Sequence, residues 1–181
     1  MDIILEQLRL EMEIGLSLGA NLGNRLLQLQ TAKKQIISAG KISFVAQSPV
    51  YETEPVDVPA IDADMFFLNA VLILETSLQA QELLSLCKRI EHQMGRAPAS
   101  LPKNARRPID VDIIYADNLR IELENITVPH PRWFKRRFVV QPLSDVRPDL
   151  VIPAQTLTVN EILRNLPDKH RVTLSLPAGE W

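Results

Sequence analysis

Cysteine is nearly absent from the chain, which has Cys87 alone among its 181 residues. A single cysteine excludes an intrachain disulfide and a zinc site built from several cysteines, and it fits a reducing compartment. The chain also lacks any apolar run near the roughly 18 residues that cross a membrane, and its acidic N-terminal segment is unlike a signal peptide. These absences predict a cytoplasmic protein with no membrane partner.

Positive charge is not in excess either, because the net charge is −2 at pH 7. That balance argues against general binding of nucleic acid, which depends on Lys and Arg. The basic residues are nevertheless concentrated in two short stretches, and this placement predicts one focused anion site. The first stretch contains Arg96, Lys103, Arg106 and Arg107, and the second contains Arg132, Lys135, Arg136 and Arg137.

The overall composition is that of an ordinary globular protein, with 46% hydrophobic and 23% charged residues. A chain of this length is expected to form a single domain that spans 1–181. Residues 1–13 precede the first clear strand as an N-terminal extension, and their pattern assigns them no role.

Two aspartates, Asp110 and Asp112, lie within the segment 109–115, whose β-branched and aromatic residues predict a short strand. Alternate residues of a strand share a face and lie about 6.6 Å apart at Cα, so the two carboxylates would meet on one side. Mg²⁺ would relieve their repulsion, because it takes one or two carboxylates and leaves its other positions to water and phosphate. Arg106 and Arg107, just before the strand, are suited to phosphate. Taken alone, however, a D-x-D pattern is more often two solvated acids at a sheet edge.

Strand and helix patterns alternate along the chain and predict an α+β or α/β sheet with helices packed on it. Strands are expected from residue 14 to a glycine-rich turn at 19–24, at 42–51 with an interruption near Pro49, and at 66–74, 120–128 and 171–176. Helices are expected at 25–39, from Thr76 or Ser77 to Gly95 and at 159–166, with a short helix or turn at 132–143. Two irregular loops, 53–64 and 97–108, lie between these elements.

Three polar features each have two interpretations. The turn at 19–24 is either a phosphate cradle or a tight turn without a ligand, since it matches neither a Walker loop nor a dinucleotide fingerprint. Asn69, inside an apolar strand, would bond either backbone groups, which is the commoner case, or the edge of a heterocycle. His130, between two prolines, is either a donor to phosphate or a surface side chain. Cys87 falls on the apolar stripe of its helix, so it is expected in the core.

Seven short motifs occur in order between Ile14 and Pro153. They are L-G-A-N-L-G, S-P-V-Y-E-T-E-P-V, F-L-N-A-V, R-I-E-H-Q-M-G-R, R-P-I-D-V-D-I-I, V-P-H-P-R and R-F-V-V-Q-P-L. Together they resemble the family of 6-hydroxymethyl-7,8-dihydropterin pyrophosphokinase, whose signature is the R-x-x-D-x-D run followed by apolar residues. The segment before Ile14 and the tail at 154–181 match this family weakly.

The resemblance implies a ferredoxin-like α+β core in a three-layer α-β-α sandwich with a mainly antiparallel sheet. It implies a transferase of folate biosynthesis that moves pyrophosphate from ATP to the pterin alcohol and leaves AMP. ATP and 6-hydroxymethyl-7,8-dihydropterin would be its ligands, two Mg²⁺ ions its cofactors and a monomer its working form. The pterin oxygen would attack the β-phosphorus in line, so positioning and electrostatics would carry catalysis without a covalent intermediate.

The resemblance also implies roles for individual residues. Asp110 and Asp112 would hold the two Mg²⁺ ions, and the catalytic set would be Arg96, Arg107, Asp110 and Asp112. The residues expected to bind ATP are Glu91, Arg96, Arg107, Ile113, His130 and Arg136. The residues expected to bind the pterin are Thr53, Pro55, Val56, Phe67, Asn69, Asp110 and Phe138, with Asn69 at the pterin edge and Phe138 on one ring face. Asp112 is the sole candidate for taking the proton of the alcohol.

Two positions depart from the family pattern. Arg106 stands where the signature has a small residue or proline, and Asn104 lies near the position of an expected tryptophan, so loop closure over the pterin would rely on other residues. Two other functions are weighed against this one: a D-x-D nucleotide-sugar transferase, and a non-catalytic ferredoxin-like module that binds nucleotide or a protein. The former would normally be larger and leaves Asn69 unexplained, and the latter has no need of a paired metal site.

Overall fold

The computed structural model describes residues 11–56, 64–95, 106–167 and 169–181. Arg96, which the sequence assigned to catalysis and to ATP, lies outside these ranges, as does Asn104. Among the residues described, no helix is long and apolar enough to cross a membrane.

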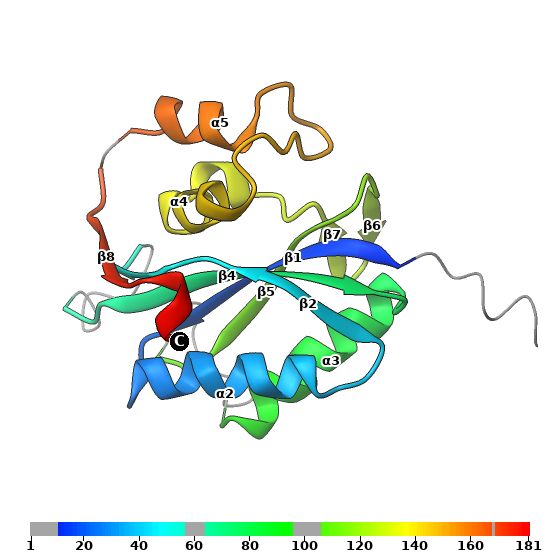
Figure 1. Cartoon of the computed structure of the whole chain (residues 1–181), viewed down its shortest axis with the longest axis horizontal. Helices are drawn as coiled ribbons and strands as arrows, with labels where there is room; N and C mark the ends of the chain where they lie inside the picture. The colour runs from blue at the N-terminus through cyan, green and yellow to red at the C-terminus, as the bar shows by residue number, and fades with distance from the viewer. Residues whose placement is uncertain (1–10, 57–63, 96–105, 168) are drawn as a thin grey trace, which may run out of the picture.

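The described residues form a six-stranded antiparallel sheet and a small hairpin (Figure 1). The strands of the sheet are β1 (Met12–Ala20), β2 (Ile42–Gln47), β3 (Val50–Thr53), β4 (Phe67–Thr76), β5 (Asp110–Ala116) and β8 (Val172–Leu176). The hairpin consists of β6 (Ile121–Leu123) and β7 (Ile126–Val128). The order across the sheet is β5-β1-β4-β3-β8, with β2 also paired to β4, so the predicted antiparallel sheet is confirmed.

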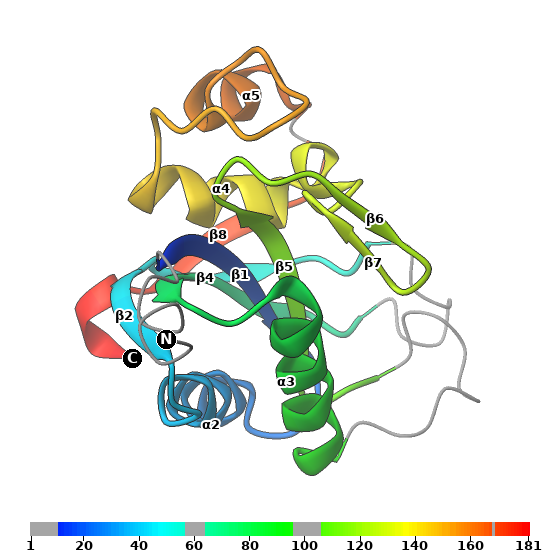
Figure 2. The ribbon, with the colours of Figure 1, turned by 90° about the vertical axis from the view of Figure 1, so that its right-hand side faces the viewer.

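Helices cover both faces of this sheet and complete three layers, as Figures 1 and 2 show from two sides. One face carries α2 (Arg25–Ile37) and α3 (Ala80–Gln93), and the other carries α4 (Arg137–Val146) with α5 (Val159–Asn165) outside it. Short 3-10 helices, η2 (Trp133–Lys135) and η3 (Ala178–Glu180), flank the C-terminal third. The order β1-α2-β2/β3-β4-α3-β5 is the β-α-β-β-α-β pattern of a ferredoxin-like fold, which confirms the predicted α+β class.

β4 is the most deeply buried strand, because Leu68 through Leu74 are each at most 6% exposed. This burial confirms the prediction from its nearly unbroken apolar sequence, which is typical of a central strand covered on both faces. Below the sheet, Leu83, Cys87 and Ile90 of α3 are buried in the core. Cys87 is fully buried, so its predicted core position is confirmed, and this burial raises the pKa of its thiol to about 12.

The interruption predicted near Pro49 is confirmed: the segment 42–51 forms two strands, because proline has no N–H for the ladder, and β2 and β3 pair with different parts of β4. The boundary predicted for the next helix was wrong. The helix expected to begin at Thr76 or Ser77 begins at Ala80. Thr76 instead ends β4, and the N–H of Gln79 donates to Glu82 Oε2 at 2.8 Å, so the cap at Gln79 lies two or three residues later than predicted.

A charged cluster joins β1, β5 and the end of α4. The Glu13 carboxylate accepts hydrogen bonds from Arg147 Nη2 at 2.6 Å and from the Tyr115 hydroxyl at 2.6 Å. The Arg147 hydrogen bond lowers the pKa of Glu13 below its ordinary value. The Tyr115 ring packs directly over Gly15, where a Cβ would lie 2.3 Å from Tyr115 Cε1. The β1–β5 pair therefore depends on a glycine and a paired carboxylate at the end remote from Asp110.

We expect Gly15→Ala to destabilise the fold by about 2 kcal/mol, because its methyl group must displace the buried Tyr115 ring. Urea unfolding measures this loss. Gly179→Ala is the matched control, since a Cβ at Gly179 would have no atom within 4 Å. Equal stability of the two variants would contradict the packing at Gly15.

The Glu13 cluster also predicts a dependence of stability on pH. The lowered pKa means that the folded chain binds fewer protons than the unfolded chain near and below pH 4.5, so the cluster's stabilisation is present above that pH and lost as pH falls further. We expect Glu13→Gln to reduce the free energy of unfolding at about pH 7 and to have a smaller effect at about pH 3. Urea unfolding of both proteins at both pH values measures the difference, and a pH-independent difference would contradict it.

Candidate active site

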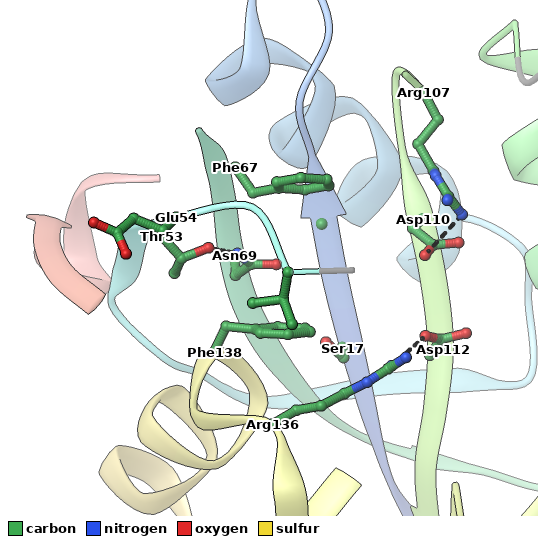
Figure 3. Close-up of a pocket in the computed structure, with 12 residues that line it drawn as sticks. Ser17, Thr53, Glu54, Phe67, Asn69, Arg107, Asp110, Asp112, Arg136 and Phe138 are labelled. Atoms are coloured by element: carbon green, nitrogen blue, oxygen red, sulfur yellow. Dashed lines mark hydrogen bonds and ion pairs between the residues drawn. The ribbon is translucent and has the colours of Figure 1, made fainter. Parts of the chain in front are cut away.

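One cleft collects residues from β1, β3, β4, β5 and the start of α4 (Figure 3). Counted out to its open mouth, the empty space of this cleft is about 670 Å³. Its walls combine aromatic, carboxamide, carboxylate and guanidinium groups. The lining residues are Ser17, Gly19, Thr53, Glu54, Val56, Phe67, Asn69, Arg107, Asp110, Asp112, Arg136 and Phe138.

Antiparallel pairing brings three distant segments of the chain into one row across the sheet. Gly19 of β1 pairs with Asn69 of β4 on one side and with Asp110 of β5 on the other. Adjacent strands are about 4.8 Å apart, so Asn69 and Asp110 stand on strands about 10 Å apart. A Cβ at Gly19 would lie 3.0 Å from the amide oxygen of Asn69. The glycine therefore leaves the floor of the cleft open between a carboxamide and a carboxylate.

Each aspartate of β5 faces the cleft and has an arginine beside it. Arg107 Nη1 lies 3.2 Å from Asp110 Oδ2, and Arg136 Nη1 lies 3.8 Å from Asp112 Oδ2. The carboxylates are 31% and 34% exposed, so a ligand can reach both of them. Both side chains line the same cleft, which agrees with the alternation along a strand.

The two carboxylates fit Mg²⁺ better than a metal that needs a full set of protein ligands. In the part of the chain that the structure describes, no group of three or more His, Cys, Asp or Glu side chains is arranged to hold a metal. Mg²⁺ binds through one or two carboxylates, with water and phosphate oxygens in its other positions. Asp110 and Asp112 offer such a partial donor set on a rigid strand, beside cationic groups suited to phosphate.

His130 is a partly buried neutral donor beside Asp112, not a surface side chain. Its Nδ1 accepts the Arg132 N–H at 3.1 Å, so the neutral ring carries its proton on Nε2, which lies 4.0 Å from Asp112 Oδ2. Burial, together with the charges of Arg136 and Arg132, lowers the pKa of His130 to about 4. At neutral pH the imidazole therefore offers an N–H without a full charge.

Glu91 lies behind the aspartate strand and does not line the cleft. Its side chain is 1% exposed, and its Oε1 accepts the backbone N–H of Val111, the residue between the two aspartates, at 2.9 Å. Its Oε2 pairs with Lys88 Nζ at 3.0 Å, and burial raises its pKa. Glu91 therefore supports β5 from its outer edge.

A second groove lies along the outer edge of β5 and shares Asp112 with the first cleft. Two residues that the sequence assigned to ATP, Ile113 and His130, line it. The other lining residues are Leu84, Lys88, Val111, Glu124, Asn125, Ile126, Thr127 and Pro131. The two hollows are separated only by β5, so a ligand in either of them reaches Asp112.

The other side of the cleft is built for a flat polar ring. Asn69 Nδ2 donates to Thr53 Oγ1 at 2.7 Å, and both side chains are buried. Figure 3 shows the amide oxygen of Asn69 pointing toward the centre of the cleft, and the rings of Phe67 and Phe138 facing each other in front of it. Two aromatic faces and a fixed carboxamide can hold a heterocycle by stacking and by its edge.

The structure brings most of the predicted site together. Thr53, Val56, Phe67, Asn69, Arg107, Asp110, Asp112, Arg136 and Phe138 line the cleft, whereas Pro55 is not among the lining residues. The sequence did not identify Ser17 or Glu54, and it placed Gly19 in the turn at 19–24, whereas Gly19 lies within β1 and lines the cleft. Asn21 of that turn holds the approach to β5, because its Oδ1 accepts the Arg107 N–H at 2.9 Å.

Comparison with known proteins identifies the family. The model of a family described as 7,8-dihydro-6-hydroxymethylpterin-pyrophosphokinase (HPPK) matches residues 15–148. The chain belongs to this family.

Curated relatives agree with that assignment. A 2-amino-4-hydroxy-6-hydroxymethyldihydropteridine pyrophosphokinase of Haemophilus influenzae is 32% identical over 160 residues, which are 88% of this chain and 96% of that protein. The folic acid synthesis protein fol1 of Schizosaccharomyces pombe is 37% identical over 157 residues, which are 85% of this chain but 20% of that protein. The chain spans 20% to 27% of the length of the folic acid synthesis and bifunctional folate synthesis proteins that it matches.

Solved structures agree on the fold. An HPPK-DHPS crystal structure in complex with substrates superposes on this chain with a TM-score of 0.68 at 11% identity. The superposed region covers 85% of this chain and 43% of the HPPK-DHPS chain. An HPPK-DHPS of Plasmodium falciparum superposes with a TM-score of 0.66 at 15% identity, and it covers 90% of this chain and 46% of that chain.

We expect Thr53→Val to weaken binding of a pterin and to destabilise the fold by about 1–3 kcal/mol, because it leaves the buried Asn69 amide without its acceptor. Thr53→Ser keeps the hydroxyl and is the matched control, so it should retain affinity. Calorimetric titration with a pterin and urea unfolding measure the two effects. Equal pterin affinity in the valine and serine variants would show that the hydroxyl does not orient Asn69.

Proposed function

We propose that the chain transfers pyrophosphate from ATP to 6-hydroxymethyl-7,8-dihydropterin, giving AMP and the pterin diphosphate, as a step of folate biosynthesis. The observation that carries this proposal is the row Asn69, Gly19 and Asp110, which places a carboxamide and a carboxylate on opposite sides of one open floor. Family membership supports the same reaction.

In this proposal the pterin ring lies between Phe67 and Phe138, with its polar edge against Asn69. Val56 and the nearby Pro55 bound the ring on the side of β3. The hydroxymethyl group would then extend over Gly19 toward Asp110, because Gly19 has no side chain and lies between Asn69 and Asp110 in the row. ATP would lie beyond β5, with its phosphates between the aspartates and the arginines and with Ile113 in the outer groove.

Asp110 and Asp112 would hold two Mg²⁺ ions. Bound there, the ions would neutralise charge on the ATP phosphates and align the β-phosphorus with the pterin oxygen. The two carboxylates on one face of β5 support metal binding at this place. Two is the number of ions that we propose.

The cationic side chains would stabilise negative charge that accumulates on the transferring group. Arg107 and Arg136 stand within 4 Å of the aspartates, so they would lie on both sides of the phosphates. His130 would add a neutral N–H donor, and Arg96 would complete the set. Glu91 would act through the backbone of Val111.

The pterin oxygen would attack the β-phosphorus, the bond to the oxygen of AMP would break, and the alcohol proton would leave to a base or to water. Asp112 is the candidate base among the residues described, since it faces the cleft beside His130. A monomeric working form and a cytoplasmic location are part of the same proposal.

We expect AMP to form from ATP and Mg²⁺ only when 6-hydroxymethyl-7,8-dihydropterin is present. Asp110→Ala and Asp112→Ala should each lower the rate at least about 100-fold, because each removes a metal ligand at the reacting phosphates. Asp149→Ala, which alters an exposed aspartate outside the cleft, should retain the rate.

A coupled AMP assay and titration with Mg·ATP provide the measurements. Absence of pterin-dependent AMP from the unaltered chain would overturn the proposed reaction and favour the binding module. Full activity of either alanine variant would overturn the metal role of that aspartate.

A further inference from the structure

The strand β8 lies outside the residues that the family model matches, yet it covers the free edge of the strand that carries Thr53. It pairs with all of β3, from Val50 opposite Leu176 to Thr53 opposite Val172. On its other edge β3 pairs with β4 at only three positions, Tyr51, Glu52 and Thr53. A strand this short depends on both neighbours for its position.

The first anchor of β8 lies next to the candidate pterin pocket. The N–H of Glu54 donates to the carbonyl of Arg171 at 3.1 Å, and the N–H of Arg171 donates to Glu54 Oε2 at 3.2 Å. Figure 3 shows the Glu54 carboxylate turned away from Asn69, toward this strand. The Arg171 guanidinium also lies 5.0 Å from the centre of the Phe66 ring. Glu54, the residue after Thr53, is therefore hydrogen-bonded to Arg171, the residue just before β8.

The second anchor is Trp181, at the other end of β8. Its indole N–H donates to the Ser48 carbonyl at 2.8 Å, and its own backbone carbonyl accepts from Lys33 Nζ at 2.9 Å and from Gln47 Nε2 at 2.8 Å. The Lys33 ammonium lies 5.0 Å from the centre of the Trp181 ring. Trp181 is 8% exposed. The anchor thus reaches the break between β2 and β3.

Ser48 transmits this contact to β4. Its backbone N–H donates to the Val71 carbonyl at 2.9 Å, and its hydroxyl accepts the Val71 N–H at 2.8 Å. Ser48 is fully buried, so these bonds and the Trp181 bond fix the beginning of β3 within the sheet.

We propose that β8, held by Trp181 and by the Glu54–Arg171 pair, is a positioning element for the pterin side of the cleft. It keeps β3 in register so that Thr53 holds the Asn69 carboxamide at 2.7 Å. The aspartates of the metal side lie on β5, which is separated from β3 and β8 by β4 and β1. This inference rests on the proposed function, since it concerns how the same cleft selects the pterin.

Trp181→Ala removes the indole donor and the ring, so we expect the KM and the Kd for the pterin to rise by about fivefold or more. The KM for Mg·ATP should stay within about twofold of its original value. Trp181→Phe keeps a ring near Lys33 and loses only the N–H, so it should restore part of the pterin affinity. Amide hydrogen exchange at Glu54 should accelerate in the alanine variant, because its partner Arg171 is no longer held.

Leu83→Ala is the matched control. It truncates a fully buried side chain on α3, whose main contacts are with β5 and α2, and it should lower the melting temperature. If the pterin effect came from stability alone, this variant would reproduce it at equal loss of melting temperature. We expect Leu83→Ala to leave the pterin KM and the Glu54 exchange rate unchanged.

The outcomes separate this inference from the proposed reaction. An unaltered chain that neither binds the pterin nor forms AMP would overturn the proposed function, and the inference with it. An active chain whose Trp181→Ala variant keeps both its pterin affinity and its Glu54 protection would overturn the inference alone. A parallel rise in the KM of the pterin and of ATP would also overturn it, because β8 would then support the whole cleft.

Discussion

Repulsion between two carboxylates on one face of one strand is the constraint on which this site depends. Alternation puts Asp110 and Asp112 about 6.6 Å apart at Cα, and each carboxylate is only partly exposed to water. Two cationic side chains lie beside these carboxylates. Arg107 comes from the segment just before the strand, and Arg136 comes from the start of α4. Glu91 adds a hydrogen bond to the backbone between the aspartates, so the strand cannot turn to separate the charges.

The rest of the sheet sets the distance between this charged edge and the ring-binding wall. β1 lies between β4 and β5, and its small residues Ser17 and Gly19 form the floor where larger side chains would fill the cleft. Gly15, farther along the same strand, makes room for Tyr115 instead. In this one strand, the absence of a side chain at Gly19 keeps the cleft open, and the absence of a side chain at Gly15 makes room for the Tyr115 ring.

The sequence predicted those features correctly that depend on residues close together in the chain. The alternation of Asp110 and Asp112, the apolar run of β4 and the helical stripe that buries Cys87 all follow from neighbours within a few residues. It did not predict features that depend on residues far apart in the chain. The start of α3 depended on whether Thr76 stayed in the sheet, and the role of Gly19 appeared only when register placed it between two other strands.

The same distinction separates the two sides of the cleft. The metal side needs one strand and its own i, i+2 spacing, which any chain with this motif carries in a few consecutive residues. The proposed pterin side needs Thr53 and Asn69 on adjacent strands, and Thr53 in turn pairs with a strand more than 100 residues later in the chain. A motif search therefore recognises the charged half of such a site directly, whereas the ring-binding half is determined by strand pairing at both edges of β3.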